Sequence, residues 1–95
     1  MKTFLILHHG FEKPSEDQMA SWNGWFESIA DRRVDMGGLR GGRKISDDGT
    51  AELPFDRNAL TGYTIIQAKD LDEAAGIAAE CPYVISTQVY EIQKG

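Results

Sequence analysis

The sequence predicts an α+β fold of the ferredoxin-like βαββαβ type, with an antiparallel sheet and both helices on one of its faces. Two strand-like apolar segments, residues 2–9 and 63–68, each lead into a segment with a helix cap and helical spacing. A glycine-rich hairpin between these halves adds a short extra strand, and residues 84–92 supply the last strand. This order is a split βαβ arrangement. With 95 residues, we expect one domain, residues 1–95.

The first half of the chain reads as a strand followed by a helix. Residues 2–9 contain the run FLIL, which is apolar on both faces, as in a strand covered on two sides, and Gly10 ends the strand. Ser15 is a suitable N-cap, with Gln18 three residues later, where a capping box requires it. The predicted helix continues to the glycine pair 37–38. Its wide apolar face consists of Met19, Trp22, Trp25, Phe26 and Ile29.

The middle of the chain reads as a hairpin followed by a strand. Within residues 36–53, we predict a turn at Asp48-Gly49, because glycine accepts the positive φ of tight hairpins. Pro54 takes the segment 53–55 out of the ladder, because proline lacks the N–H donor. We predict a loop at 58–62. The strand at 63–68 follows from its β-branched and aromatic residues.

The last third of the chain reads as a helix and a final strand. Asp70 is the predicted N-cap, with Glu73 three residues later, and Pro82 ends the helix before the strand at 84–92. Because alanine is small, the helix can lie close to the sheet. Its predicted buried stripe consists of Leu71, Ala74, Ala75 and Ala78.

The predicted sheet has one face without cover from its own chain. Right-handed crossovers place both helices on the same face. The other face also carries apolar residues, so we expect a second copy of the chain to cover it by two-fold symmetry, with the sheets packed face to face. The expected assembly is a homodimer of the dimeric α+β barrel type.

Composition and charge exclude several classes of protein. The net charge of −5 repels phosphate backbones, so we expect no nucleic-acid partner. The single cysteine excludes an internal disulfide and fits a reducing compartment. No stretch approaches the ~20 apolar residues of a membrane span, and the apolar run at 4–7 is shorter than a signal-peptide core. We therefore expect a cytoplasmic protein without a membrane partner.

Several segments of the chain resemble a known family. Residues 62–84, GYTIIQAKDLDEAAGIAAECPYV, are similar to the signature half of the YCII-related proteins: a strand, an aspartate-rich helix cap with following alanines, and a Pro-Tyr turn. The opening MKTFLIL and the LPF at 53–55 resemble the related DGPF-domain proteins, in which a Gly-Pro-Phe step precedes the GY strand. The resemblance spans nearly the whole chain. It implies a dimeric α+β barrel without one settled reaction, and in YCII-like proteins a His-Asp acid/base pair.

The chain departs from that pattern at two places. The turn that reads Asp-Pro-Tyr in YCII-like proteins is Cys81-Pro82-Tyr83 here. The histidine that the resemblance implies on the first helix is missing, and Trp22 lies near that place. The family's acid/base pair is therefore absent, or it is rebuilt from other residues.

His8 and His9 are the candidate catalytic residues. Neighbours on a strand point to opposite faces, so at most one of them belongs to a site. Imidazole suits a general acid or base, because its ordinary pKa lies near neutral pH. The alternative is a pair of polar residues at the solvent-exposed end of the strand. No HxH or HxxxH spacing supports a metal site, and we predict neither a metal nor a cofactor.

Five residues are candidate ligand-binding residues, each with a structural alternative. Arg40 and Arg43 lie among glycines, where bare amides and guanidinium groups suit a small anion such as a carboxylate; the alternative is an exposed basic hairpin. Asp56 and Tyr63 would stand at a pocket rim, unless Asp56 is an ordinary loop charge. Cys81 would line the pocket where the family has its aspartate. A helix C-terminus disfavours a thiolate, so the alternative is a small buried thiol in a turn.

These residues favour one function and leave two alternatives open. The leading hypothesis is a homodimeric YCII-like protein that binds a small organic molecule, including anions, between its sheet and helices. Cofactor-free acid/base chemistry of the isomerase or lyase kind would suit such a pocket. The first alternative is a non-catalytic ligand-binding or assembly module. The second is a haem-binding or metal-binding barrel protein. Whether the protein is an enzyme stays open at this point.

Overall fold

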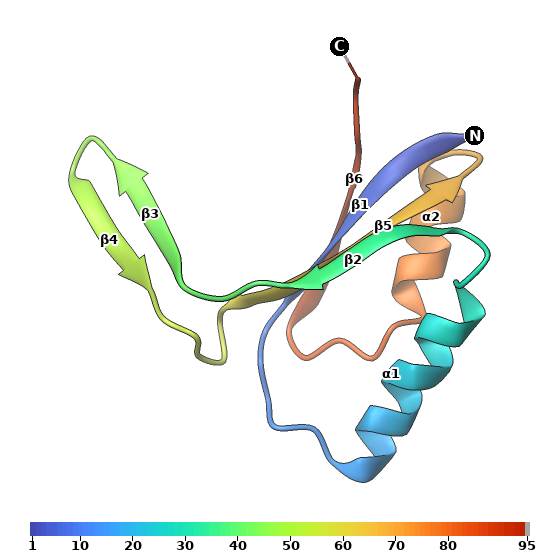
Figure 1. Cartoon of the computed structure of the whole chain (residues 1–95), viewed down its shortest axis with the longest axis horizontal. Coiled ribbons are helices and arrows are strands. Elements are labelled where there is room, and N and C mark those ends of the chain that lie inside the picture. Colours follow the sequence, from blue (N-terminus) through green and yellow to red (C-terminus); the bar gives the residue numbers. More distant parts are fainter. Residues whose placement is uncertain (95) are drawn as a thin grey trace.

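The computed structural model describes residues 1–94, which form two helices and six strands (Figure 1). In chain order these are β1 (Lys2–His9), α1 (Glu16–Ser28), β2 (Arg33–Gly38), β3 (Gly42–Ser46), β4 (Gly49–Leu53), β5 (Leu60–Ala68), α2 (Leu71–Ala79) and β6 (Ser86–Glu91). None of the helices in this part of the chain is long and apolar enough to cross a membrane.

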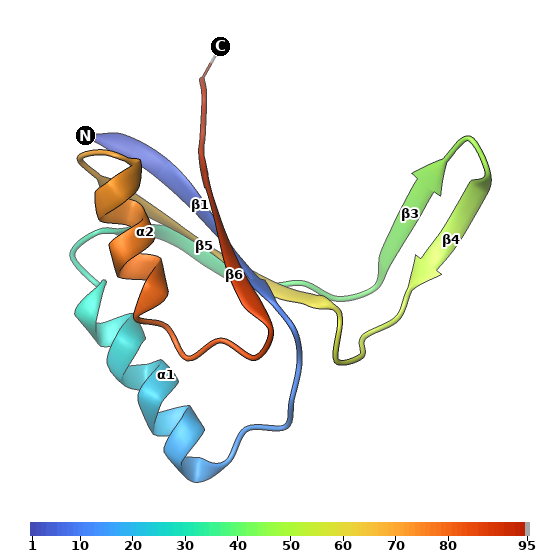
Figure 2. The ribbon, with the colours of Figure 1, turned by 180° about the vertical axis from the view of Figure 1, so that it is seen from behind.

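Four of the strands form one antiparallel sheet in the order β2-β5-β1-β6, and β3 and β4 pair separately. Both helices lie on the same side of the four-stranded sheet (Figures 1 and 2). This is the strand order of a split βαβ fold. The predicted ferredoxin-like fold class, with a hairpin strand added to it, is therefore confirmed.

The core lies between the sheet and the two helices. Along β1 the buried residues alternate with half-buried ones, so that Phe4, Ile6 and His8 face the helices while Leu5 and Leu7 face the other side. β5 repeats this alternation beside β1. The apolar core consists of Phe4, Ile6, Trp25, Ile29, Ile66, Ala68, Ala74, Ala78 and Cys81.

The two helices stand at different distances from the sheet. α2 turns Ala74 and Ala78 toward the core and approaches β5 and β6 closely, as predicted from its small residues. Among the described elements, α1 makes no comparably close backbone approach, because large aromatic side chains fill the space beneath it. Trp25 joins the two helices, since its Nε1–H donates to the carbonyl of Ile77 at 3.0 Å.

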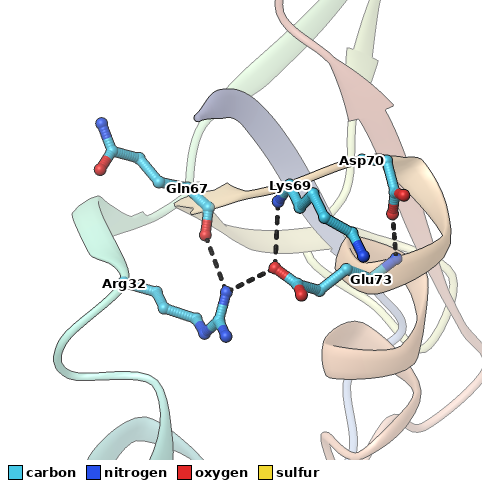
Figure 3. Close-up of polar contacts among 5 residues, drawn as sticks. All are labelled: Arg32, Gln67, Lys69, Asp70 and Glu73. Carbon is cyan, nitrogen blue, oxygen red and sulfur yellow. Dashed lines mark hydrogen bonds and ion pairs between the residues drawn. The ribbon is translucent and has the colours of Figure 1, made fainter.

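The caps that the sequence predicts for both helices are present. Ser15 and Gln18 form the capping box of α1, with hydrogen bonds of 2.8 and 3.2 Å. At the start of α2, Asp70 accepts a hydrogen bond of 2.9 Å from the backbone N–H of Glu73 (Figure 3). Both helices therefore begin where their cap residues indicate.

Glu73 ties the start of α2 to the segment that follows α1 (Figure 3). Its Oε1 accepts from the backbone N–H of Lys69 at 3.0 Å and from Nη1 of Arg32 at 2.7 Å. The hydrogen bond from Lys69, followed by that from Arg32, lowers the pKa of the Glu73 carboxyl. Arg32 Nη1 also reaches the carbonyl of Gln67 at 3.5 Å.

The predicted extent of the first helix was wrong. α1 ends at Ser28 with Ile29 as C-cap, instead of continuing to the glycine pair 37–38. The backbone N–H groups of Arg32 and Arg33 both donate to the carbonyl of Ile29 and turn the chain back. Residues 33–38 then pair with β5 as strand β2. The helical apolar spacing stops at Ile29, so nothing anchors a longer helix to the core.

Smaller corrections concern the hairpin and two strands. The last pair of the β3–β4 ladder is Ser46 with Gly49, so the turn consists of Asp47 and Asp48, one residue earlier than predicted. Gly49 has the expected positive φ of 113°. β4 ends at Leu53 before the proline, as predicted. β5 begins at Leu60, inside the segment predicted as a loop, and β6 is shorter than the predicted 84–92.

Three residues predicted to lie on the apolar faces of the helices are exposed at the surface. Met19 is 53% exposed, because it lies near the N-terminal end of α1, which diverges from the sheet (Figure 1). Leu71 and Ala75 on α2 are also exposed. Ile77, which was not predicted as a core residue, packs against the core in their place.

The β3–β4 hairpin projects away from the sheet (Figures 1 and 2). We call residues 42–53 the hairpin arm. All ten of its strand residues are exposed, and its two strands contact no other helix or strand of the described chain. The molecule measures 41 × 40 × 18 Å and is therefore flat.

Candidate functional site

His8 lies in the core at the end of β1, beneath α1. Its Nε2 is 2.9 Å from Oγ1 of Thr64 on β5, and its Nδ1 has no hydrogen-bond partner among residues 1–94. The rings of Trp22 and Trp25 meet the imidazole edge to face, with centroid distances of 5.2 and 5.7 Å. Burial lowers the pKa of His8 from 6.5 to about 4, so the ring is neutral at pH 7.

Cys81 borders the same end of the core. Its Sγ is 3.2 Å from Oγ1 of Thr87, which lies directly opposite His8 in the β1–β6 ladder. Burial raises the pKa of the Cys81 thiol, so it is protonated at neutral pH. Its surroundings are those of a small buried thiol and not of an activated nucleophile.

His9 lies on the opposite face of the sheet and is held through both ring nitrogens. Nε2 is 2.9 Å from the carbonyl oxygen of Asn58, and Nδ1 is 3.2 Å from Oγ of Ser86. Because a carbonyl only accepts, Nε2 carries a proton and donates it, and in the neutral ring Nδ1 accepts from the Ser86 hydroxyl. His9 thus connects the loop before β5 to the start of β6.

One cavity lies at the base of the hairpin arm and has a volume of about 540 Å³. We call it the hairpin-base cavity. Its walls are mainly apolar, and two charged side chains stand among them. The large apolar residues of its lining are Leu39, Leu53, Pro54, Phe55 and Leu60, and the charged ones are Arg40 and Asp56. Asn58, whose carbonyl holds His9, also lines it.

Arg40 is the distinctive residue of this cavity. Its guanidinium carbon lies 4.0 Å from the centroid of the Phe55 ring, which is a cation–π distance. The Phe55 ring is in turn 4.6 Å from that of Phe11, measured between centroids. Nη1 of Arg40 donates to the carbonyl of Leu39 at 3.0 Å, and the guanidinium forms no ion pair with any carboxylate of residues 1–94.

The structure places the predicted site residues in separate parts of the molecule. Arg40 and Asp56 share the hairpin-base cavity, where Oδ1 of Asp56 accepts from the backbone N–H of Asn58 at 2.9 Å. Arg43 lies further out on the hairpin arm, 3.6 Å from a carboxylate oxygen of Glu52. Arg43 therefore has an exposed position on the arm, as in the alternative interpretation of a basic hairpin.

Tyr63 lies on the sheet face away from the helices. Its hydroxyl donates to Oδ2 of Asp35 on the neighbouring strand β2 at 3.1 Å. This hydrogen bond, followed by the negative charge of Asp35, raises the pKa of Tyr63. Tyr63 does not line either of the cavities described here.

A second, smaller cavity of about 390 Å³ lies between α2 and β6. Tyr83, Ser86 and Thr87 contribute its polar atoms, and α2 contributes alanines. Ser86 links it to His9, which therefore stands between residues of the two cavities. Among residues 1–94, no group of three or more His, Cys, Asp or Glu side chains is placed to hold a metal ion.

Several residues around these sites were not singled out from the sequence. Phe55 lies next to Arg40 where the chain leaves β4 after Pro54. Thr64 approaches His8 through the pairing of β5 with β1, and Thr87 approaches Cys81 where the chain enters β6. The one signal that could have pointed to Phe55 is an aromatic residue placed directly after a strand-ending proline.

Comparisons with known proteins identify the fold independently. Residues 4–94 match the family model of the YCII-related domain. Among solved structures, the chain is similar to 5-chloro-2-hydroxyhydroquinone dehydrochlorinase from Burkholderia phenoliruptrix, solved in complex with 2,5-dihydroxybenzoquinone. The TM-score is 0.60 at 18% identity, with 98% of this chain and 95% of that chain covered. At this identity the likeness shows the fold alone. No curated protein sequence matches.

Proposed function

The chain belongs to the YCII-related domain family, and on that premise we propose that it is a homodimeric protein that binds a small organic anion in the hairpin-base cavity. The observation that carries this proposal is the guanidinium of Arg40. It lies on the Phe55 ring, at an apolar cavity of about 540 Å³, without a carboxylate partner in residues 1–94. Small-molecule sites commonly have this size and this mixture of apolar walls with few polar groups.

The chemistry of the cavity favours a planar carboxylate as ligand. Arginine presents a flat fork of donors that matches a carboxylate with two hydrogen bonds. The apolar walls, which include Leu39, Leu53 and Leu60, suit a hydrocarbon or aromatic ring. Asp56 stands in the same lining and disfavours a second negative charge on the ligand.

If the protein is an enzyme, we propose His9 and not His8 as its acid or base. His9 borders the hairpin-base cavity through Asn58, and its ring lies near the surface. His8 is enclosed by two tryptophans and stays neutral, which suits a structural role. The reaction would be a cofactor-free proton transfer of the isomerase or lyase kind. The solved structure named above is of an enzyme with a small quinone bound, which agrees with small-molecule chemistry on this fold.

A non-catalytic ligand-binding role is the second candidate, and one observation favours it. Both ring nitrogens of His9 are already engaged, by Asn58 and Ser86. A histidine whose two ring nitrogens are both hydrogen-bonded to the protein holds the loop before β5 in place and does not exchange protons with a ligand.

We propose a homodimer because one sheet face has no cover within the chain. Leu5 and Leu7 on β1 and Ile65 on β5 are half-buried on the face opposite the helices. A second copy packed on this face would bury them by two-fold symmetry. The cytoplasm remains our proposed location, since a reducing compartment suits the single free thiol of Cys81.

A binding titration tests the proposed function. We expect benzoate to bind the native protein, and the uncharged benzamide to bind more weakly by about tenfold or more, because a charge-assisted hydrogen bond contributes about 1.5–3 kcal/mol. Arg40→Gln should abolish this preference, whereas Lys69→Gln, at an exposed position outside both the cavity and the arm, should leave it unchanged. Equal affinity for both compounds, or no effect of Arg40→Gln, would contradict an anion site.

A further inference from the structure

The hairpin arm is not packed against any other helix or strand of residues 1–94. Its strands contact only each other, and every strand residue is exposed. An isolated two-stranded hairpin is marginally stable at best in water. Ile45, the only large aliphatic residue near its tip, is 81% exposed. A surface outside the chain would therefore stabilise an arm of this kind.

The surface area of the chain indicates how large that missing contact is. A compact monomer of 10.6 kDa should expose about 5,500 Å². This chain exposes 6681 Å², which is an excess of about 1,200 Å², and a standard interface buries about 800 Å² per partner. The radius of gyration of 14.4 Å likewise exceeds the ~12.4 Å of a compact chain of this length. The excess is large enough for one stable protein interface.

Two features identify the partner as a second copy of this chain. Each molecule has both an arm that packs against no other element and a sheet face that is not covered. In a two-fold dimer, the second copy can contact both features of the first, and the first copy can do the same for the second. The arm also carries little net charge: two basic residues, Arg43 and Lys44, against three acidic ones give −1 of the total −5. Contact through the arm therefore adds little like-charge repulsion.

The arm is also part of the cavity described above. Gly42 at the start of β3 and Leu53 at the end of β4 belong both to the arm and to the cavity lining. The position of the arm therefore fixes one wall of the cavity.

We infer that the hairpin arm of each copy docks on the other copy, and that the hairpin-base cavity reaches its ligand-binding form only when the arm is docked. The first half of this inference rests on the arm alone. The second half rests on the proposed function. The partner is thus a structural component of the site, because it would hold the arm whose Gly42 and Leu53 form part of the cavity lining.

Hydrogen exchange on the native protein tests the docking. We expect the backbone amides of residues 42–53 to be protected at high protein concentration and to lose protection on dilution below the dissociation constant of the dimer. The sheet amides of β1 serve as an internal reference for the folded state. Rapid exchange of the arm in a dimer verified by analytical ultracentrifugation would overturn the inference, and so would arm protection that persists in the monomer.

A matched pair of variants tests the contact directly. Ile45→Asp changes a side chain that is 81% exposed, on an arm whose strands contact only each other among the helices and strands of residues 1–94, so the fold should be retained. We expect it to raise the dimer dissociation constant by about tenfold or more, because burial of an isoleucine counts twice in a two-fold contact. Met19→Asp, at an exposed position on α1 outside the arm, should leave the constant unchanged. Equal constants for both variants would count against the docking.

The outcomes separate this inference from the proposed function. If benzoate fails to bind while the arm is protected only in the dimer, the proposed ligand is wrong and the docking stands. If Arg40-dependent binding holds while the arm is unprotected in the dimer, the docking is wrong and the proposed function stands. Ile45→Asp should also weaken benzoate binding at concentrations where it is monomeric; full affinity in that monomer would refute the link between the arm and the cavity.

Discussion

Two adjacent histidines in this chain have different environments, and the pleat of β1 is the cause. His8 points under α1, among two indoles and Thr64, and burial there lowers its pKa to about 4. His9 points to the other face and bridges a loop to β6 through its two nitrogens. A sequence pattern indicates that such neighbours diverge. Their separate environments depend on what the fold brings to each face.

The lowered pKa of His8 predicts a specific dependence of stability on pH. The unfolded ring binds a proton below its ordinary pKa of 6.5, whereas the folded ring resists protonation down to about 4. Between these values the unfolded state holds more protons, so stability falls as pH decreases, by roughly 1–3 kcal/mol in total. Urea unfolding at several pH values should show this loss in the wild type.

Two variants assign that pH dependence to its residue. His8→Gln should flatten the dependence between pH 6.5 and about 4, because glutamine has no proton to gain. His9→Gln removes the neighbouring imidazole, which is less enclosed, and should keep the dependence. A wild-type slope that survives in His8→Gln would refute the assignment.

Gly37 permits the contact between Tyr63 and β2. A Cβ at this position would lie 2.7 Å from Cε1 and 3.0 Å from the hydroxyl oxygen of Tyr63. We expect Gly37→Ala to displace the ring, to break its hydrogen bond to Asp35 and to destabilise the fold by about 1 kcal/mol. Spectrophotometric titration should show the raised pKa of Tyr63 return toward its ordinary value. Tyr63→Ser in the same background should remove the steric cost.

For single residues, the sequence indicated which side chains are chemically suited to a site better than it indicated which of them lie next to one another. Arg40 and Asp56 were singled out as binding residues, and both line the hairpin-base cavity. Arg43, only three positions on, lies beside Glu52 on the arm instead. The difference arises from the bend where the chain leaves the sheet, and no local pattern encodes it.

Among the elements, the first helix shows how tertiary pairing limits local reasoning. Its start was predicted because a capping box is a local signal. Its end was misplaced because residues 33–38 have no strong preference of their own, and their partner β5 lies far along the chain. The predicted starts of both helices thus held, whereas boundaries that depend on distant partners did not.

Glycines within the elements should respond to alanine in opposite directions. Gly24 lies in α1 with no atom within 4 Å of an added Cβ, so Gly24→Ala should stabilise the protein by up to about 1 kcal/mol. Gly62 lies in β5, where a Cβ would stand 2.9 Å from the backbone oxygen of Gly37. Gly62→Ala should therefore destabilise, because that oxygen belongs to the paired strand. Urea unfolding of both variants measures the contrast; equal signs would contradict the local geometry.

For the molecule as a whole, the ferredoxin-like plan was predictable and the projection of the hairpin was not. The strand order follows from two helices and the handedness of their crossovers, and the sequence indicates both helices through their cap residues. The position of the arm has no such signal, because its strands contact no other helix or strand of residues 1–94. An element that packs against no other element of its own chain cannot be placed from intrachain patterns.

A homodimer predicts that stability depends on protein concentration. Association stabilises the folded state by mass action, so the melting temperature should rise as the protein is concentrated. Differential scanning calorimetry over a wide concentration range measures this directly. A melting temperature independent of concentration, together with monomer mass in ultracentrifugation, would contradict the homodimer.

The placement of the tryptophans gives the protein an optical reporter of its own. Both of its indoles lie against the imidazole of His8, and the hairpin arm contains none. A protonated imidazole quenches nearby indole emission, so ultraviolet fluorescence should dim with acidification of the core and stay constant while the arm moves. Tryptophan fluorescence thus distinguishes protonation of His8 beneath α1 from movement of the hairpin arm, without any attached dye.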